Sequence, residues 1–165
     1  MRSDIRRLYV AAMLASLAVA TGCSGDSDKP TLDEATKQLI ADGNKLLSSR
    51  ELAATGSATA TESADQETEA GCVKGQIQRF FRAQGQLTGP PYVHSPGTAV
   101  GLIRGLLATQ GYQTIVDDLD LEDENLGTTV LLNPKTGITF LATVRNGQQP
   151  NIMIVGKTSC YERGA

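Results

Sequence analysis

The sequence has no tryptophan, only 4% aromatic residues and a single histidine, His94. Nucleophilic catalysis needs a nucleophile beside a base, and most glycosidases need two carboxylates in one cleft. The chain also has no Gly-x-Ser-x-Gly motif and no glycine-rich phosphate loop between a strand and a helix. These absences argue against a hydrolase or a nucleotide-dependent enzyme, so we expect neither catalytic residues nor a cofactor.

Clusters of basic residues are absent as well. Without its first 22 residues the chain keeps 12 of its 15 basic and 17 of its 18 acidic residues, so its formal charge is −5. Proteins that bind duplex nucleic acid carry grouped cations that displace counterions from the phosphates. We therefore expect no nucleic-acid partner.

The apolar run at the start of the chain is too short for a membrane-spanning helix. Residues 8–20 are 13 in number and apolar except for Ser16, whereas a spanning helix needs roughly 20. The run follows three arginines, and this combination is typical of a signal peptide over residues 1–22. Arg6 and Arg7 are adjacent, so both the general and the twin-arginine export routes stay open.

The run ends in Ala20-Thr21-Gly22-Cys23. This segment resembles the lipobox of bacterial lipoproteins, in the variant found in small actinomycete-type lipoproteins of unassigned function, although Ala20 stands where leucine is usual. The resemblance implies cleavage between Gly22 and Cys23 and diacylglycerol on the sulfur of Cys23. The alternative is a soluble secreted protein with a chance cysteine at the cleavage site.

Two other cysteines, Cys72 and Cys160, remain in the exported chain. Outside the cytoplasm an even pair of cysteines predicts a disulfide. It would close a loop of 89 residues, for which the chain-entropy model gives a stabilisation of about 4–5 kcal/mol. A metal site built on the same pair lacks further ligands, because His94 is the only histidine.

The exported chain begins with a polar tether, residues 23–30, and an N-terminal helix within 31–52. Thr31 and Glu34 have the spacing of a capping box, and leucines then recur at helical spacing from about 32 to 50. Residues 53–71 have no large apolar side chain, so burial offsets none of the entropy of ordering them. We interpret 53–71 as an acidic linker or loop.

Residues 73–87 fit either a strand or a helix, and period-two alternation favours the strand. As a strand, the segment places five polar side chains mainly on one side: Gln76, Gln78, Arg82, Gln84 and Gln86. Such a face could bind a glycan or a protein partner. It could equally be the solvated side of a sheet whose other side is covered.

Ser95-Pro96 predicts the start of a second helix, with serine as N-cap and proline at the first position. Gly97, Gly101 and Gly105 share one face of it, and we expect this face to pack closely against a sheet. Later segments have strand patterns separated by turn residues. Residues 72–165 are therefore expected to form an α+β core. Together with the N-terminal helix, the fold is expected to have two helices on one face of a mainly antiparallel four- to five-stranded sheet and one disulfide.

Residues 117–124 contain six carboxylates. Asp118, Asp120 and Glu122 alternate as the first ligands of a helix–loop–helix calcium site do. The pattern then fails, because Asp123 stands where that site needs glycine and Thr129 where it needs glutamate. We interpret the segment as a solvated loop without metal, and calcium binding is the weaker alternative.

Together these features predict a non-enzymatic binding or interaction module, lipid-anchored at the extracytoplasmic face of the cell membrane. Its partner would be an envelope protein, a glycan or a lipid. Two alternatives remain at this point. One is a small envelope enzyme, or an accessory to one, that uses His94 or the acidic loop. The other is a carrier that holds an apolar ligand between helix and sheet.

Overall fold

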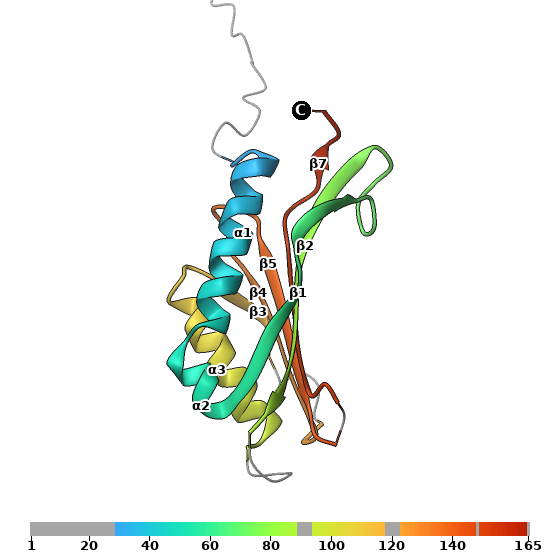
Figure 1. Ribbon diagram of the computed structural model, residues 1–165. Helices are drawn as coiled ribbons and strands as arrows, with labels where there is room; N and C mark the ends of the chain where they lie inside the picture. The colour runs from blue at the N-terminus through green and yellow to red at the C-terminus, as the bar shows by residue number, and fades with distance from the viewer. Residues whose placement is uncertain (1–28, 89–93, 118–122, 148, 165) are drawn as a thin grey trace, which may run out of the picture.

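The computed structural model describes residues 29–88, 94–117, 123–147 and 149–164. Within these ranges, three helices lie on one face of a sheet (Figure 1). The helices are α1 (Leu32–Leu47), α2 (Arg50–Thr55) and α3 (Pro96–Ala108). The strands are β1 (Gly56–Thr68), β2 (Gln76–Leu87), β3 (Gln113–Val116), β4 (Leu126–Leu132), β5 (Thr139–Arg145), β6 (Ile152–Lys157) and β7 (Tyr161–Glu162).

The strand order of the sheet is β1-β2-β6-β5-β4-β3, and every neighbouring pair is antiparallel. The short β7 lies off this path and pairs with β2. The predicted α+β class and mainly antiparallel sheet are confirmed. The element counts were too low, because the described residues form seven strands and three helices.

The prediction that residues 53–71 form a linker or loop is wrong. Part of this segment belongs to α2, and most of it forms β1, a strand of 13 residues that pairs with β2 from Gly56 to Thr68. Main-chain hydrogen bonds to β2 offset the ordering entropy that the small side chains cannot offset. A strand at the edge of a sheet therefore needs few large apolar residues.

Helix α1 begins as predicted and ends earlier. The main-chain nitrogen of Thr31 donates to the Glu34 carboxylate at 2.9 Å, and Glu34 N donates to Thr31 Oγ1 at 3.3 Å, which completes the capping box. These hydrogen bonds, that to the Thr31 backbone most of all, hold the pKa of Glu34 below its usual range. The helix ends at Leu47 because Ser49 serves as the N-cap of α2, accepting from Leu52 N.

Two glycines allow α1 to lie close to the sheet. A Cβ atom at Gly43 of α1 would lie 2.6 Å from ring carbons of Phe81, and one at Gly156 of β6 would lie 2.6 Å from the Phe140 ring. The two rings contact each other edge to face. The other large side chains that are fully buried are Leu39, Leu46, Leu52, Gln78, Ile103, Leu107, Leu131, Ile138, Ile152 and Ile154.

The expected close packing of α3 through its glycines is wrong at two positions. Gly105 faces open space, and the atom nearest to a Cβ at Gly101 would be a guanidinium nitrogen of Arg104, 3.9 Å away. The close approach lies at Gly127 of β4, where a Cβ would collide with the carbonyl of Pro96. The buried residues of α3 are Pro96, Ala99, Val100, Ile103 and Leu107.

A buried hydrogen bond crosses the core. The Tyr112 hydroxyl donates to Asp42 Oδ2 at 2.7 Å, and Gln38 Nε2 donates to Asp42 Oδ1 at 2.7 Å. Burial, followed by the hydrogen bond to Asp42 and its charge, raises the pKa of Tyr112 well above its ordinary value. The pair links α1 to the residue just before β3, and we interpret it as structural because it satisfies a buried carboxyl.

Cys72 and Cys160 form the predicted disulfide, with their Cα atoms 5.7 Å apart across 88 positions of sequence. The bond joins the β1–β2 turn, residues 69–75, to the segment between β6 and β7. A second link lies beside it, because Arg163 N donates to Gly75 O at 3.1 Å. The turn is therefore fixed to the C-terminal segment at two places.

Candidate binding surface on the open face of the sheet

The helices cover one face of the sheet and leave the other open (Figure 1). The strand interpretation of residues 73–87 is confirmed for Gln76–Leu87. Phe81 and Ala83 are buried in the core, so the alternating residues Arg82, Gln84 and Gln86 point to the open face, where all three are exposed.

The two glutamines nearer the β1–β2 turn do not belong to an exposed face. Gln78 is only 1% exposed, and its Nε2 donates to the carbonyl of Ala70 in the turn that covers it. Gln76 is half-buried, and its Nε2 donates to Glu162 Oε1 of β7 at 2.7 Å. The predicted polar face of five residues therefore keeps three. The period-two pattern correctly indicated the side of the strand on which these side chains lie. It could not show that other segments of the chain cover two of them.

Arg82 is held flat at the border of the open face. Its guanidinium carbon lies 4.5 Å from the centroid of the Phe80 ring, and its Nε lies 2.6 Å from Glu62 Oε2. Stacking on the ring and pairing with the carboxylate restrain the guanidinium in one orientation. Arg82 is thus a fixed edge of the surface whose charge is already compensated.

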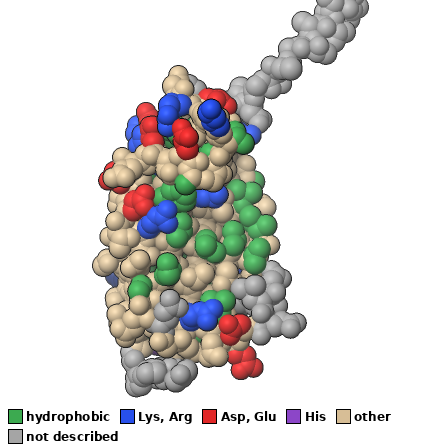
Figure 2. Space-filling model, turned by 90° about the vertical axis from the view of Figure 1, so that its right-hand side faces the viewer, with side chains coloured by type: hydrophobic (Ala, Val, Ile, Leu, Met, Phe, Trp, Pro, Cys, Tyr) green, Lys and Arg blue, Asp and Glu red, His purple; other side chains and the backbone are tan. Residues whose placement is uncertain are grey.

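Apolar side chains occupy the middle of the open face. One row of paired residues crosses the sheet from β4 through β5 and β6 to β2. In this row each residue pairs with the next: Val130, Leu141, Val155 and Arg82. Leu141 is 37% exposed, and Met153, which lies beside this row, is 41% exposed. Figure 2 looks at this face and shows hydrophobic side chains grouped across it. We call the following residues the apolar patch: Phe80, Val130, Leu132, Leu141, Met153 and Val155.

Lys157 adds a positive charge to the apolar patch. It pairs with Phe80 on one side and with Thr139 on the other, and it is half-buried. None of the carboxylates that the structure describes forms an ion pair with it. The lysine stem can lie along apolar neighbours while the ammonium stays at the surface. The patch therefore has an uncompensated cation among apolar side chains.

The apolar patch was missed although the sequence carries a signal for it. In β6 the core positions are Ile152 and Ile154, yet the alternate positions hold Met153 and Val155. A strand with one solvated face normally has polar residues in the outward phase. Apolar residues in both phases indicate an outer face that is also built for contact.

Two shallow hollows border the apolar patch and share Pro150. The first is lined by Ser57, Thr59, Gln84, Gly85, Gln86 and Pro150. The second is lined by Leu126, Thr128, Thr143, Arg145, Pro150, Asn151 and Met153. Neither lining includes a histidine, a cysteine or a carboxylate, so neither offers a nucleophile beside a base.

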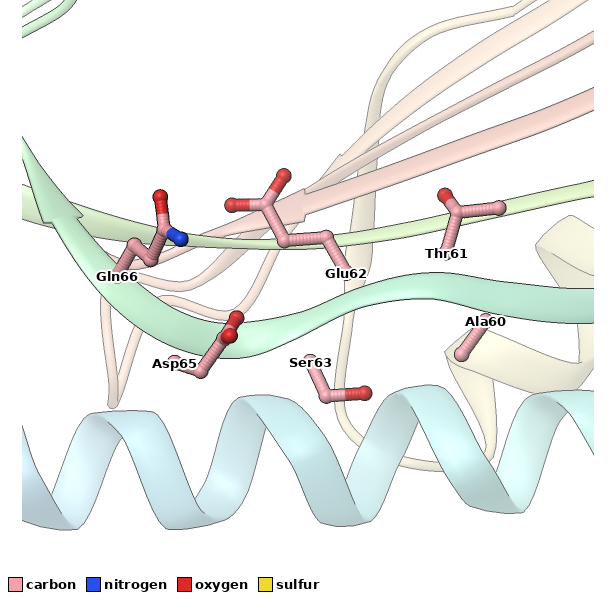
Figure 3. A pocket seen from close by; sticks show the side chains of 6 residues that line it. All are labelled: Ala60, Thr61, Glu62, Ser63, Asp65 and Gln66. Carbon is pink, nitrogen blue, oxygen red and sulfur yellow. The ribbon is translucent and has the colours of Figure 1, made fainter.

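A third hollow lies along β1. Figure 3 shows its six lining residues, all from this strand, with side chains that do not converge on a single point. β1 has extra residues relative to β2 here, and the buried Ala64 adopts a left-handed φ of 57°. The Glu62 carboxylate in this lining is already paired with Arg82. We interpret the hollow as a result of the register shifts in β1.

Among the described residues, no hydrogen bond joins His94 to a nucleophile. This side chain is half-buried just before α3. The neighbouring Ser95 serves as N-cap, its Oγ accepting from Thr98 N at 3.1 Å and bonding Thr98 Oγ1 at 2.7 Å. The Ser95 hydroxyl is therefore engaged in the cap of α3.

The weak calcium candidates Asp118, Asp120 and Glu122 lie outside the described residues. The acids that flank them are engaged, because Asp117 pairs with Arg104 at 3.4 Å and Asp123 with Arg145 at 3.8 Å. The described part of the chain contains no group of three or more side chains suited to hold a metal ion. The lipidation site, Cys23, also lies outside the described residues.

Comparisons with protein-family models, with curated proteins and with solved structures found no match for this chain. Among the helices of the described residues, none has the length and apolar character that crossing a membrane requires. The candidate site therefore rests on the geometry of the open face alone.

Proposed function

We propose that this chain is a non-enzymatic binding module of the bacterial cell envelope, held at the membrane by lipid on Cys23. The open face of its sheet binds a protein partner. The observation that carries this proposal is the apolar patch with Lys157 within it, on the face of the sheet opposite to the three helices that the structure describes.

Two features support the proposed location. Residues 20–23 resemble a lipobox, which would place lipid on Cys23. The Cys72–Cys160 disulfide is typical of proteins that fold outside the reducing cytoplasm. Both features agree with export, and the first supplies the anchor.

The form of the surface favours a protein over a small ligand. Small molecules bind in concave sites, whereas protein interfaces combine an apolar centre with a polar rim. The apolar patch follows strands of an open sheet and is bordered by Arg82, Gln84 and Arg145. The carrier alternative finds no support at Gly43 and Gly156, where α1 and the sheet are already in contact.

Lys157 gives the partner a stated chemistry. An apolar partner surface alone would leave this ammonium desolvated without compensation. A carboxylate among apolar side chains would pair with it and fix the register of the complex. We therefore expect the partner to present apolar residues around at least one Asp or Glu.

The anchor is tested by growing a bacterial host with an alkyne-labelled fatty acid. We expect mass spectrometry to show that the wild-type chain carries the label on Cys23 and lacks residues 1–22. We expect a Cys23→Ser variant to carry no label and to be absent from the membrane fraction. Equal labelling of the two proteins, or an unlabelled wild type in the membrane fraction, would contradict the anchor.

The binding surface is tested by photo-crosslinking in cells of the source organism. A photoreactive amino acid at Leu141 samples the apolar patch, and the same amino acid at the exposed Thr109 samples the helical side. We expect a specific adduct from position 141, and we expect Lys157→Glu to reduce its yield. Replacing the partner's pairing Asp or Glu by Lys should restore the yield in the Lys157→Glu protein. Adducts of the same proteins from both positions, or none from position 141, would argue against the proposed surface.

A further inference from the structure

The described chain starts at the same end of the molecule as the β1–β2 turn. The first turn of α1, β7 and the turn 69–75 all lie at this end (Figure 1). Burial raises the pKa of Tyr161 in β7, and the charges of Lys29 and Glu34 act on it in opposite directions, which is consistent with this proximity. Any anchor that precedes Lys29 is therefore connected to this end.

The turn 69–75 is a rigid projection. The disulfide from Cys72 and the hydrogen bond from Arg163 N to Gly75 O tie it to the C-terminal segment. An ion pair between Arg163 and Glu69, 3.0 Å long, adds a third link. The turn cannot fold back to bury its own side chains, so a side chain exposed there stays exposed.

Val73 at the tip of this turn is 67% exposed, the largest value among the large apolar side chains that the structure describes as exposed. The neighbouring Lys74 is exposed as well and forms no ion pair with a described carboxylate. Glu69 of the same turn is compensated by Arg163. The tip thus presents an apolar side chain beside a free cation, which suits an interface between acyl chains and anionic headgroups.

The tether fixes which end of the molecule meets the bilayer. Lys29 lies six residues beyond Cys23, so even a fully extended tether reaches only about 20 Å. Helix α1 has 16 residues and extends about 24 Å from that point. With lipid on Cys23, the end that carries Val73 is held near the membrane and the opposite end is carried away from it.

We propose that the disulfide-fixed turn 69–75 rests on the lipid surface, with Val73 inserted at the headgroup boundary and Lys74 on the phosphates. This inference rests on the lipid anchor of the proposed function. Insertion of one valine is too weak to hold a protein alone, and the anchor supplies the high local concentration that makes it effective. The open face of the sheet then stands upright on the membrane and remains free for its partner.

The absence of tryptophan from the sequence makes a direct test available. Val73→Trp gives a single-tryptophan protein, and the exposed Met153 on the open face provides the matched Met153→Trp control. Each full-length gene is expressed in a bacterial host, and the processed protein is reconstituted in vesicles of phosphatidylcholine and phosphatidylglycerol. Matched vesicles carry bromine on the acyl chains, which quenches only tryptophan that reaches the lipid.

We expect Val73→Trp to show blue-shifted emission and strong quenching by the brominated lipid, and Met153→Trp to show neither. Lys74→Glu in the Val73→Trp protein should reduce the quenching several-fold, because it replaces attraction to the anionic lipid with repulsion. Equal quenching at both positions, or no quenching at Val73→Trp, would overturn the proposed contact.

Intact-mass measurement of the same sample separates the two proposals. An acylated protein whose Val73→Trp emission is not quenched overturns the lipid contact alone and leaves the anchor in place. A protein without acyl chains on Cys23 overturns the anchor and, with it, the contact that depends on it.

Discussion

At the scale of single residues, the hydrogen bond from Tyr112 to Asp42 makes a measurable contribution to stability. Tyr112→Phe leaves Asp42 Oδ2 buried without this donor, and we expect a loss of about 1–3 kcal/mol in the free energy of unfolding at neutral pH. Urea titration followed by circular dichroism measures this loss. An unchanged midpoint would show that water replaces the phenol.

The same residue gives a pH dependence. The pKa of Tyr112 is raised in the folded protein, chiefly by burial, so its contribution is complete below the ordinary value of about 10 and is lost as the pH rises above it. Tyr112→Phe should therefore flatten the fall of the melting temperature at alkaline pH. Tyr161→Phe is the comparison: the pKa of Tyr161 is also raised, chiefly by burial, but this residue lies outside the core and is not bonded to a carboxylate that the structure describes, so its substitution should flatten the fall less than Tyr112→Phe does.

Two glycines in helices should respond in opposite directions to the same substitution. Gly43→Ala places a methyl group against the Phe81 ring and should destabilise the fold by about 1–3 kcal/mol. Gly105→Ala meets open space within α3 and should stabilise it by about 0.5–1 kcal/mol. Denaturant unfolding of both variants checks the pair. A gain in stability for Gly43→Ala, like that expected for Gly105→Ala, would mean that α1 is not seated closely on the sheet.

At the scale of elements, the capping box of α1 links helix stability to acid. Thr31→Ala removes the hydroxyl that accepts from Glu34 N and donates to the Glu34 carboxylate, while the main-chain nitrogen of residue 31 keeps its own bond to that carboxylate. The variant therefore loses the cap and the smaller of the two hydrogen bonds that lower the pKa of Glu34, and we expect a melting temperature lower by about 2–5 °C at neutral pH. A carboxyl whose pKa is lowered by folding stabilises the folded state fully at pH values above its pKa in the unfolded chain, and this contribution is lost as the pH falls. The difference in melting temperature between the wild type and Thr31→Ala should therefore shrink as the pH falls below about 4.5.

Ser95→Ala is the matched control for the capping prediction. Ser95 caps α3 in the same way as Thr31 caps α1, but the first turn of α3 contains no acidic residue. The cost of this substitution should therefore be the same at pH 7 and in acid. A parallel pH response in both variants would show that global acid unfolding, and not Glu34, controls the difference.

The elements that the sequence predicted correctly have local signals. The capping box, the Ser95-Pro96 start of α3 and the alternation in residues 73–87 each depend on neighbours in sequence. β1 was missed because its stability comes from pairing with β2, and the small side chains of Gly56–Thr68 show no trace of that partner. The exposure of Gln78 was misjudged for the same reason, since a turn that covers a residue is a feature of tertiary structure.

At the scale of the whole molecule, the two faces of the sheet should respond differently to loss of apolar area. Leu141→Thr on the open face should lower the free energy of unfolding by no more than about 1 kcal/mol, because the side chain is 37% exposed and leaves no cavity in the core. Ile154→Ala on the covered face should cost about 2–5 kcal/mol, because it leaves a cavity in the core.

Only the first of these two substitutions should also weaken the proposed partner complex while the fold stays intact. Thermal unfolding and crosslinking of each variant separate the two effects. A large loss of stability in Leu141→Thr would show that the apolar patch belongs to the core and is not a surface for binding.

The register shifts of β1 have a consequence for molecules held side by side. Between Ala60 and Glu62 the chain of β1 advances by two residues while its partner β2 advances by one. Between Ser63 and Glu67 it advances by four residues while β2 advances by two. Under the proposed lipid anchor, copies in one membrane would meet at high lateral density, where a straight edge strand would pair with its neighbour into a continuous ribbon. The bulges of β1 would interrupt that growth, so the anchored molecules would crowd in two dimensions and still diffuse as separate units.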